Sequence, residues 1–185
     1  MNLQRHRQCG VTLIELLMSL IMLGVLLSIA APAFGSFLEA GHMRSARSEL
    51  SVTLNQARMT AASRDTRVVV CPSPDLRNCE RTTHWHRGWM AFVDRNRDGV
   101  HGADEPVVAL EQAQPKGLAI ASSTGRRLVT YRPDGSATGS NLTLTFCDRR
   151  GENHATALIL NNAGRLRSGV PSHPAAAAAC ALVDR

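Results

Sequence analysis

An uninterrupted apolar segment near the N-terminus constrains this chain more than any other feature. Residues 11–31 contain one charged side chain, Glu15, and only three hydroxyl side chains. As a helix with a rise of about 1.5 Å per residue, this segment is about long enough to cross a hydrocarbon core of ~30 Å. The ten residues before it include Arg5, His6 and Arg7 and no acid. Under the positive-inside rule, the N-terminus stays cytoplasmic and the chain beyond the segment lies across the membrane.

Two general interpretations explain only part of this segment. A plain membrane anchor does not explain Glu15, because an ionised carboxylate inside the membrane costs ~2–3 kcal/mol on insertion scales. A secretory signal peptide fits Ala31-Pro32-Ala33, which is an A-x-A-like cleavage pattern. However, the apolar region of a signal peptide is normally only ~7–15 residues long.

The apolar segment begins with Gly10-Val11-Thr12-Leu13-Ile14-Glu15. This motif resembles the N-terminal signature of type IV pilins and pseudopilins, in which cleavage follows the glycine and the glutamate is invariant. The resemblance implies that a prepilin peptidase cuts after Gly10 and methylates Val11, although the family usually has Phe or Met there. It also implies that Glu15 compensates the charge of a neighbouring subunit's N-terminal amine during assembly. Pro32 stands where pilins carry a proline that kinks the helix.

Composition favours one globular domain with a polyanionic partner. The chain has 185 residues and a net charge of +6, and loss of a ten-residue leader would remove Arg5 and Arg7. What remains after the leader and a membrane helix is enough for one domain of ordinary size. The basic residues are almost all arginine, with Lys116 as the only lysine. A positive domain favours nucleic acid or acidic lipid as a partner.

The cysteines indicate an oxidising compartment. Cys9 belongs to the leader, which leaves Cys71, Cys79, Cys147 and Cys180. Their order suggests a Cys71–Cys79 and a Cys147–Cys180 disulfide, although four cysteines allow three pairings. A metal site is the competing interpretation, but no Cys-x-x-Cys spacing is present, so we prefer disulfides.

The pattern after residue 33 predicts a continued helix and then strands. Apolar residues recur at three- and four-residue spacing up to Ala61, so we expect one amphipathic helix that ends near residues 63–65. Arg44, Arg47, Arg58 and Arg64 mark its solvated side. From residue 67 the pattern changes to strands at 68–70, 89–93, 107–110, 118–121, 128–131, 142–147 and 156–160. We expect a turn at 161–164 and a loop-like tail from Ser168.

These elements predict an α+β fold. A long N-terminal transmembrane and amphipathic helix is followed by an antiparallel β-sheet domain. The expected organisation is a prepilin leader (1–10), a transmembrane helix segment (11–33), its amphipathic continuation (34–64) and a β-rich domain (65–185).

The middle of the chain carries a further set of motifs: Val69-Val70-Cys71-Pro72-Ser73, Cys79, Trp85, Gly88-Trp89, Phe92 and Asp94-Arg95-Asn96. These motifs resemble those of the GspH/FimT subgroup of minor pilins and pseudopilins. The resemblance implies two antiparallel sheets behind the helix.

Two segments carry metal-ligand patterns. Asp94, Asn96, Asp98 and Glu105 fit the spacing of a Ca²⁺ loop, with a glycine at its sixth position. The expected flanks are strands, Arg95 and Arg97 add positive charge, and the same residue types are common in turns, so we favour a turn capped by Asp94 and Asp98. His84 and His86 form a single His-x-His pair, which is a weak metal signal. We therefore expect no cofactor, with Ca²⁺ as the alternative. No motif of a hydrolase, a metalloprotease or a phosphate-binding loop is present, and we expect no enzyme activity.

Gly164-Arg165-Leu166-Arg167 is the strongest candidate for binding. In an extended chain, residues two apart project to the same side, so Arg165 and Arg167 form a pair of guanidinium groups suited to backbone phosphates. The segment resembles the Gly-Arg-x-Arg motif of FimT-type pilins implicated in DNA uptake. Arg149 and Arg150 extend this patch if their loop lies nearby. The alternative is a charged edge strand that prevents aggregation.

Together the resemblances imply a minor pilin of the inner membrane that is processed by prepilin peptidase. It would cross the membrane once, with a cytoplasmic N-terminus and a periplasmic C-terminal domain, and then enter a filament with other pilins or pseudopilins. They imply DNA binding for natural transformation. The alternative is a structural pseudopilin of the type II secretion system.

Overall fold

A computed structural model describes residues 12–183, so the predicted processing site at Gly10 and Val11 lies outside the described residues. The chain forms two compact units, one up to Leu38 and one from Glu39 onwards. Helix α1 (Leu13–Ser63) contributes to both. In the first unit its large apolar side chains are exposed, and among the described residues α1 is the helix long and apolar enough to cross a membrane.

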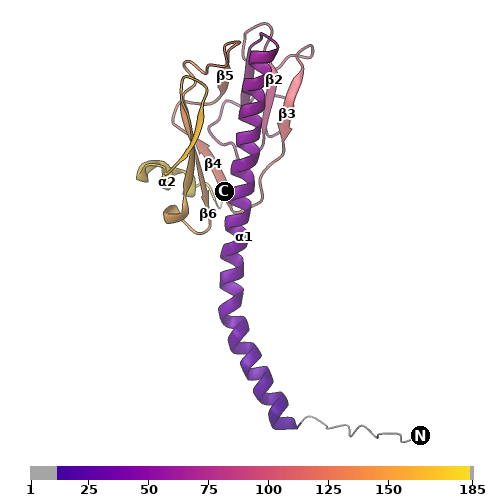
Figure 1. Ribbon diagram of the computed structural model, residues 1–185, viewed down its shortest axis with the longest axis vertical. Helices are drawn as coiled ribbons and strands as arrows, with labels where there is room; N and C mark the ends of the chain where they lie inside the picture. Colours follow the sequence, from indigo (N-terminus) through magenta and orange to yellow (C-terminus); the bar gives the residue numbers. More distant parts are fainter. Residues whose placement is uncertain (1–11, 184–185) are drawn as a thin grey trace, which may run out of the picture. The chain divides into compact units, whose positions relative to one another are not determined.

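The second unit contains two antiparallel four-stranded sheets (Figure 1). The first sheet has the order β3-β2-β1-β5 and the second has the order β4-β6-β7-β8. The strands are β1 (Val68–Pro72), β2 (Trp89–Val93), β3 (Val107–Glu111), β4 (Leu118–Ser122), β5 (Val129–Tyr131), β6 (Leu142–Asp148), β7 (Thr156–Leu160) and β8 (Leu166–Gly169). A short 3₁₀ helix, η1 (Glu152–His154), follows β6, and helix α2 (His173–Cys180) follows β8.

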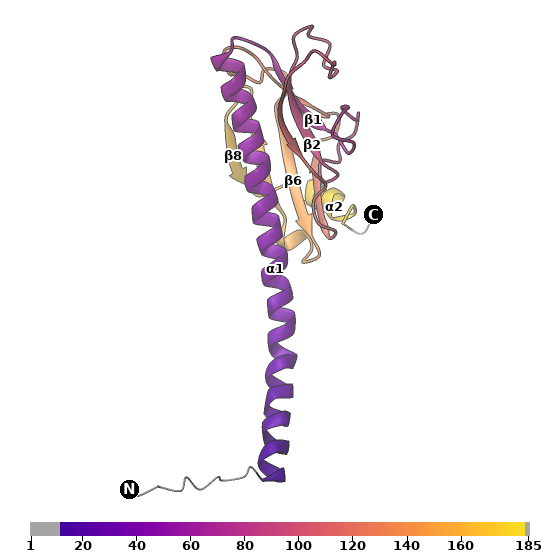
Figure 2. The same ribbon diagram turned by 90° about the vertical axis from the view of Figure 1, so that its right-hand side faces the viewer.

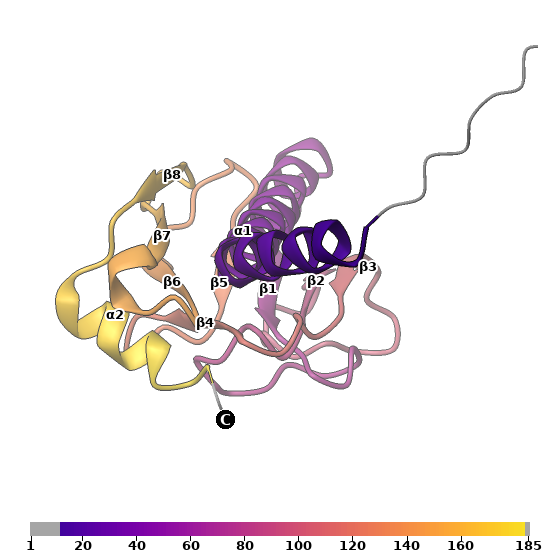
Figure 3. The ribbon, with the colours of Figure 1, turned by 90° about the horizontal axis from the view of Figure 1, so that it is seen from below.

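The core of this unit lies between α1 and the inner faces of both sheets, which lie to either side of the helix (Figure 3). The buried face of α1 repeats at helical spacing through Met43, Ala46, Leu50, Leu54, Ala57 and Ala61. Three of these residues are alanines, so the helix can approach the sheets closely where they lie. Trp89, fully buried on β2, donates its indole N–H to Thr53 Oγ1 on α1 at 3.1 Å. Burial of the ring therefore leaves no unpaired donor.

The first sheet is covered on its outer face as well. Val69, Cys71, Met90 and Phe92 form a second buried cluster there, beneath the loops that follow β1 and β2. A strand buried on both faces reads as a continuous apolar run rather than as an alternation. This explains why β1 begins with three successive valines.

The structure contains both predicted disulfides. Cys71 pairs with Cys79 across a Cα–Cα distance of 5.6 Å and closes the loop after β1. Cys147 on β6 pairs with Cys180 across 5.1 Å and fastens α2 to the outer face of the second sheet. Both Cα separations lie in the ordinary range for disulfides.

The prediction of α+β class is confirmed, and α1 ends at Ser63, where the pattern predicted. The prediction of a loop-like tail from Ser168 is wrong. Strand β8 continues to Gly169, and α2 follows it (Figure 2). Pro174 stands in the first turn of α2 and a run of alanines follows, which are favourable residues for starting and continuing a helix. The tail was predicted as a loop because it is rich in Pro and Ala, but the proline lies where a helix tolerates it and the alanines favour a helix.

Candidate nucleic-acid interface

The β7–β8 hairpin carries the predicted Gly-Arg-Leu-Arg segment. Its turn is closed by Asn161, whose carbonyl accepts the Gly164 N–H at 2.9 Å and whose side-chain Oδ1 accepts the Arg165 N–H at 3.0 Å. Gly164 has a φ of 74°, in the left-handed region that a residue with a side chain rarely adopts. The motif therefore begins at a backbone position that requires glycine.

A second turn, residues 132–137, supports the hairpin from one side. The Ala137 N–H donates to the Asn162 carbonyl at 2.9 Å. Arg58 on α1 joins the two turns, because its Nε donates to the Gly135 carbonyl at 2.9 Å and its Nη2 donates to the Ala163 carbonyl at 3.3 Å. The prediction that Arg58 marks the solvated side of the helix is therefore wrong. It is half-buried and fixes the position of the hairpin.

Within β8, alternate residues face opposite sides of the second sheet. Leu166 is paired with Leu160 and packs against the core, whereas Arg167 is paired with Ile159 on the outer face. Arg165 and Arg167, which we call the hairpin arginines, are both exposed. Within residues 12–183, no carboxylate forms an ion pair with either of them. Their guanidinium groups are thus available for an external anion.

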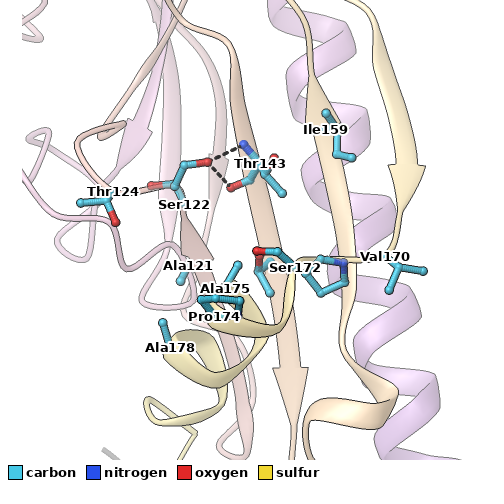
Figure 4. Close-up of a pocket in the computed structure, with 13 residues that line it drawn as sticks. Ala121, Ser122, Thr124, Thr143, Ile159, Val170, Ser172, Pro174, Ala175 and Ala178 are labelled. Carbon is cyan, nitrogen blue, oxygen red and sulfur yellow. Dashed lines mark hydrogen bonds between the residues drawn. The ribbon is translucent and has the colours of Figure 1, made fainter.

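A groove of about 450 Å³ lies on the outer face of the second sheet (Figure 4). Arg167, Ile159 and Thr143 form one row across β8, β7 and β6, and the last two residues line the groove. Its other walls come from the end of β4, from the segment that leads into α2 and from α2 itself. The lining residues are small, hydroxylated or apolar, and none carries a charge. The hairpin arginines therefore supply the charge of this face, and the groove supplies hydroxyl donors.

The structure does not bring Arg149 and Arg150 to the hairpin arginines. They follow β6, whereas the hairpin is aligned with the start of β6 at Leu142. Seven residues of strand separate the two ends by roughly 20 Å. Both side chains also have partners of their own. Arg149 donates to Glu39 Oε1 at 3.2 Å, and Arg150 binds the Asp148 carboxylate at 2.7–3.0 Å.

The loop that fits the calcium pattern uses its oxygen atoms internally. Glu105 accepts the N–H groups of Arg95 at 2.8 Å and Gly102 at 3.0 Å, and Asp98 accepts the Val100 N–H at 2.7 Å. Asn96 donates to Asp98 Oδ2 at 2.8 Å. These bonds hold the loop as a closed turn. Among residues 12–183, no group of three or more His, Cys, Asp or Glu residues is arranged to hold a metal ion.

Asp94, the first residue of this pattern, is buried next to a cation. Its Oδ2 lies 3.0 Å from Arg67 Nε and accepts the Gly99 N–H at 3.2 Å. Burial raises the pKa of Asp94 above its ordinary value, and the charge of Arg67 opposes this rise. A guanidinium at this distance disfavours a metal ion at the same carboxylate.

Glu15 lies in the first turn of α1. Thr12 caps the helix, because its Oγ1 accepts the Glu15 N–H at 3.3 Å. The Thr12-x-x-Glu15 spacing is that of a capping box, which is a second reason for a glutamate at this position. The remaining predicted pair, His84 and His86, has its ring centroids 5.8 Å apart.

A long helix that continues into a domain with two antiparallel sheets is the architecture of a type IV pilin-like protein. In fold, the chain is similar to the type IV minor pilin FimU of Pseudomonas aeruginosa (strain PAO1), seen in two crystal forms. The first alignment covers 78% of this chain and 98% of the FimU chain, with a TM-score of 0.59 and 18% identity. The second covers 74% and 98%, with a TM-score of 0.52 and 17% identity.

Two family matches agree with this architecture. Residues 46–164 match the family described as type II transport protein GspH, and residues 5–31 match the prokaryotic N-terminal methylation motif. No curated protein sequence matches the chain. The chain therefore belongs to the GspH family of pilins and pseudopilins, which are structural proteins rather than enzymes.

Proposed function

We propose that this protein is a minor pilin that binds DNA through the hairpin arginines, Arg165 and Arg167. The observation that carries the proposal is the exposed position of these two side chains. Two exposed guanidinium groups without carboxylate partners in the described chain stand on the outer face of the second sheet. Asn161 and Arg58 hold their hairpin in place. Guanidinium groups of this kind bind backbone phosphates without reading bases.

The same proposal includes processing and placement in the membrane. A leader of residues 1–10 is removed by prepilin peptidase, and Val11 becomes the methylated N-terminus. Residues 11–33 cross the inner membrane once, and residues 34–64 continue the helix into the periplasm. The domain of residues 65–185 then enters a filament with other pilins. The methylation-motif match and the exposed apolar side chains of α1 support this order.

A structural pseudopilin of the type II secretion system is the second candidate. The match to the family described as type II transport protein GspH favours it. In this case the hairpin arginines are charges on β8, which is an edge strand of the second sheet. Charged side chains on such an edge prevent pairing with another chain.

We expect Arg165→Ala/Arg167→Ala to weaken duplex DNA binding by at least about tenfold at low salt. Loss of two phosphate contacts should also reduce the log–log salt slope by about 1.8. Fluorescence anisotropy of labelled duplex across a salt series, with the full chain in non-ionic detergent, measures both quantities. Arg87→Ala/Arg149→Ala removes the same charge from another part of the domain and should bind like wild type. Absence of wild-type binding at low salt would favour the pseudopilin candidate.

We expect Glu15→Ala and Glu15→Gln to leave processing intact and to impair filament assembly about equally. Both remove the charge that would compensate a neighbour's N-terminal amine in lipid. Gln retains the capping-box chemistry at this position, whereas Ala does not. Immunoblots of sheared filaments against whole cells measure incorporation. Normal incorporation of Glu15→Gln with loss in Glu15→Ala would show that capping, not charge, is what Glu15 supplies.

A further inference from the structure

Four arginines line a cleft of about 370 Å³ at the end of the first sheet where β1 begins. β1 starts there at Val68, next to the last residues of β2 and β5. The residues flanking these strand ends therefore meet in one place. They supply the arginines, which we call the cleft arginines: Arg67, Arg95, Arg97 and Arg132.

Among the described residues, two of these arginines have partners and two form no ion pair. Arg67 lies against the buried Asp94, and Arg95 Nη1 donates to the Asp104 carbonyl at 3.0 Å. In the part of the chain that the structure describes, Arg97 and Arg132 form no ion pair with a carboxylate, and both are exposed. Arg97 therefore lines the cleft from the closed turn that fits the calcium pattern, and Arg132 lines it from the position after β5.

The cleft carries two carboxylates as well. Asp94 is neutralised in place by Arg67, and its Oδ1 lies buried without a hydrogen-bond partner among the described residues. Asp65 is exposed, and no cation among the described residues forms an ion pair with it. Asp134 lies next to the cleft wall, where the Ser136 hydrogen bonds and the charge of Arg132 lower its pKa, so it is ionised at neutral pH. The cleft keeps an excess of positive charge.

The cleft and the hairpin arginines are neighbours. The Gly135 N–H donates to the Arg132 carbonyl at 2.8 Å, which closes a four-residue turn. Gly135 in turn lies against Gly164, because a Cβ at Gly164 would collide with the Gly135 carbonyl. The Cα atoms of Arg132 and Arg165 are therefore within roughly 15 Å of each other. The path between them consists of the four-residue turn, the contact of Gly135 with Gly164, and the peptide bond from Gly164 to Arg165. This distance corresponds to about four phosphates of one strand, counted along the duplex axis.

We propose that the cleft arginines form a second phosphate-binding site for the DNA held by the hairpin arginines. This inference rests on the proposed function. The backbone of one strand passes from Arg165 over the turn at residues 132–137 to Arg132 and Arg97. Because the contacts are to phosphates, the site adds affinity and orientation without sequence preference. The cleft arginines extend the hairpin arginines, whereas Arg149 and Arg150, which would extend them only if their loop lay nearby, do not.

The main test removes the two arginines that form no ion pair with a carboxylate in the described chain. Arg97→Asn/Arg132→Ala is suitable because Arg97 has a φ of 65°, which asparagine tolerates better than alanine. We expect DNA affinity to fall roughly tenfold at low salt and the salt slope to fall by about 1.8. Anisotropy with the full chain in non-ionic detergent provides both values. Arg87→Ala/Arg149→Ala, which carries the same charge change, should remain at the wild-type affinity.

A variant that removes a negative charge distinguishes a local binding site from a general effect of net charge. Asp65→Asn removes a carboxylate from the cleft at a position with a φ of 49°, which asparagine accommodates. We expect it to bind DNA severalfold more tightly. Glu152→Gln makes the same charge change on η1, beyond the Asp148 end of β6, and should have no comparable effect.

The outcomes distinguish this inference from the function on which it rests. No binding by wild type refutes both. Binding that is lost in Arg165→Ala/Arg167→Ala but unchanged in Arg97→Asn/Arg132→Ala refutes the cleft site alone. The third outcome is a loss of DNA affinity in Arg165→Ala/Arg167→Ala and in Arg97→Asn/Arg132→Ala, with a gain in Asp65→Asn but not in Glu152→Gln. It establishes that the hairpin arginines and the cleft arginines bind one continuous stretch of phosphates. Equal losses in both double variants and in Arg87→Ala/Arg149→Ala would show a general charge effect and refute the cleft site.

Discussion

We expect Cys147→Ala/Cys180→Ala to lower the free energy of unfolding by about 3–4 kcal/mol. This disulfide closes a loop with a sequence separation of 33 residues. In the chain-entropy description, such a crosslink restricts the unfolded chain more than a short one does. The bond also holds α2 against β6, where Cys147 is fully buried. Few other large apolar groups fasten α2, because its buried residues are the alanines Ala176 and Ala179.

Cys71→Ala/Cys79→Ala is the matched control. Its disulfide has a sequence separation of 8, so we expect the loss of stability to be about 2–3 kcal/mol. Urea unfolding followed by tryptophan fluorescence measures both variants, because Trp85 and Trp89 are fully buried in the core. A larger loss from the short crosslink than from the long one would show that packing under the loop after β1, and not chain entropy, determines the ranking.

The Cys147–Cys180 disulfide also affects the outer face of the second sheet. The segment that leads into α2 forms one wall of the groove on this face. If α2 detaches, this wall is lost, but the hairpin is still held by Arg58 and Asn161. We therefore expect DNA binding to weaken only slightly in the cysteine variant at temperatures where it remains folded.

The sequence was informative where local chemistry decides the structure. The strands at residues 89–93 and 156–160 were predicted with their observed bounds, because β-branched and aromatic runs between turn residues have few alternatives. The Gly-Arg-Leu-Arg segment lies in a hairpin, as the turn residues before it predicted. The order of the cysteines also gave the observed pairing.

Positions that depend on packing between distant segments were beyond the sequence. The local sequence around Arg149 does not indicate that this residue and Arg165 lie at opposite ends of β6. Their separation follows from the register of β6, β7 and β8. Arg58 fits the polar side of an amphipathic helix, yet it binds carbonyls more than 70 residues away. The cleft arginines come from the ends of three strands, and only the sheet order brings them together. Arg97 is the exception, because an arginine inside a Ca²⁺-like pattern indicates that the loop presents positive charge instead of binding a cation.

We expect Gly164→Ala to lower the free energy of unfolding by about 2–4 kcal/mol and to weaken DNA binding as strongly as Arg165→Ala/Arg167→Ala. Two costs combine at this position. A residue with a Cβ is strained at a φ of 74°, which costs about 1–2 kcal/mol. In addition, the new methyl group would overlap the Gly135 carbonyl, which also accepts a hydrogen bond from Arg58. Because the Gly135 carbonyl is a backbone atom and a Cβ has a fixed position on the backbone of residue 164, the hairpin must move away from the turn.

Gly139→Ala separates these two costs. Gly139 has a φ of 83°, but a Cβ there would meet no heavy atom within 4 Å. Only the backbone strain remains, so we expect a loss of about 1–2 kcal/mol with DNA affinity unchanged. Urea unfolding and anisotropy on the two variants give both comparisons. If Gly164→Ala binds DNA like wild type despite its loss of stability, the arginines do not need a fixed hairpin and bind as flexible charges. If its affinity falls while both arginines are still present, their placement against the turn at residues 132–137 is part of the binding site.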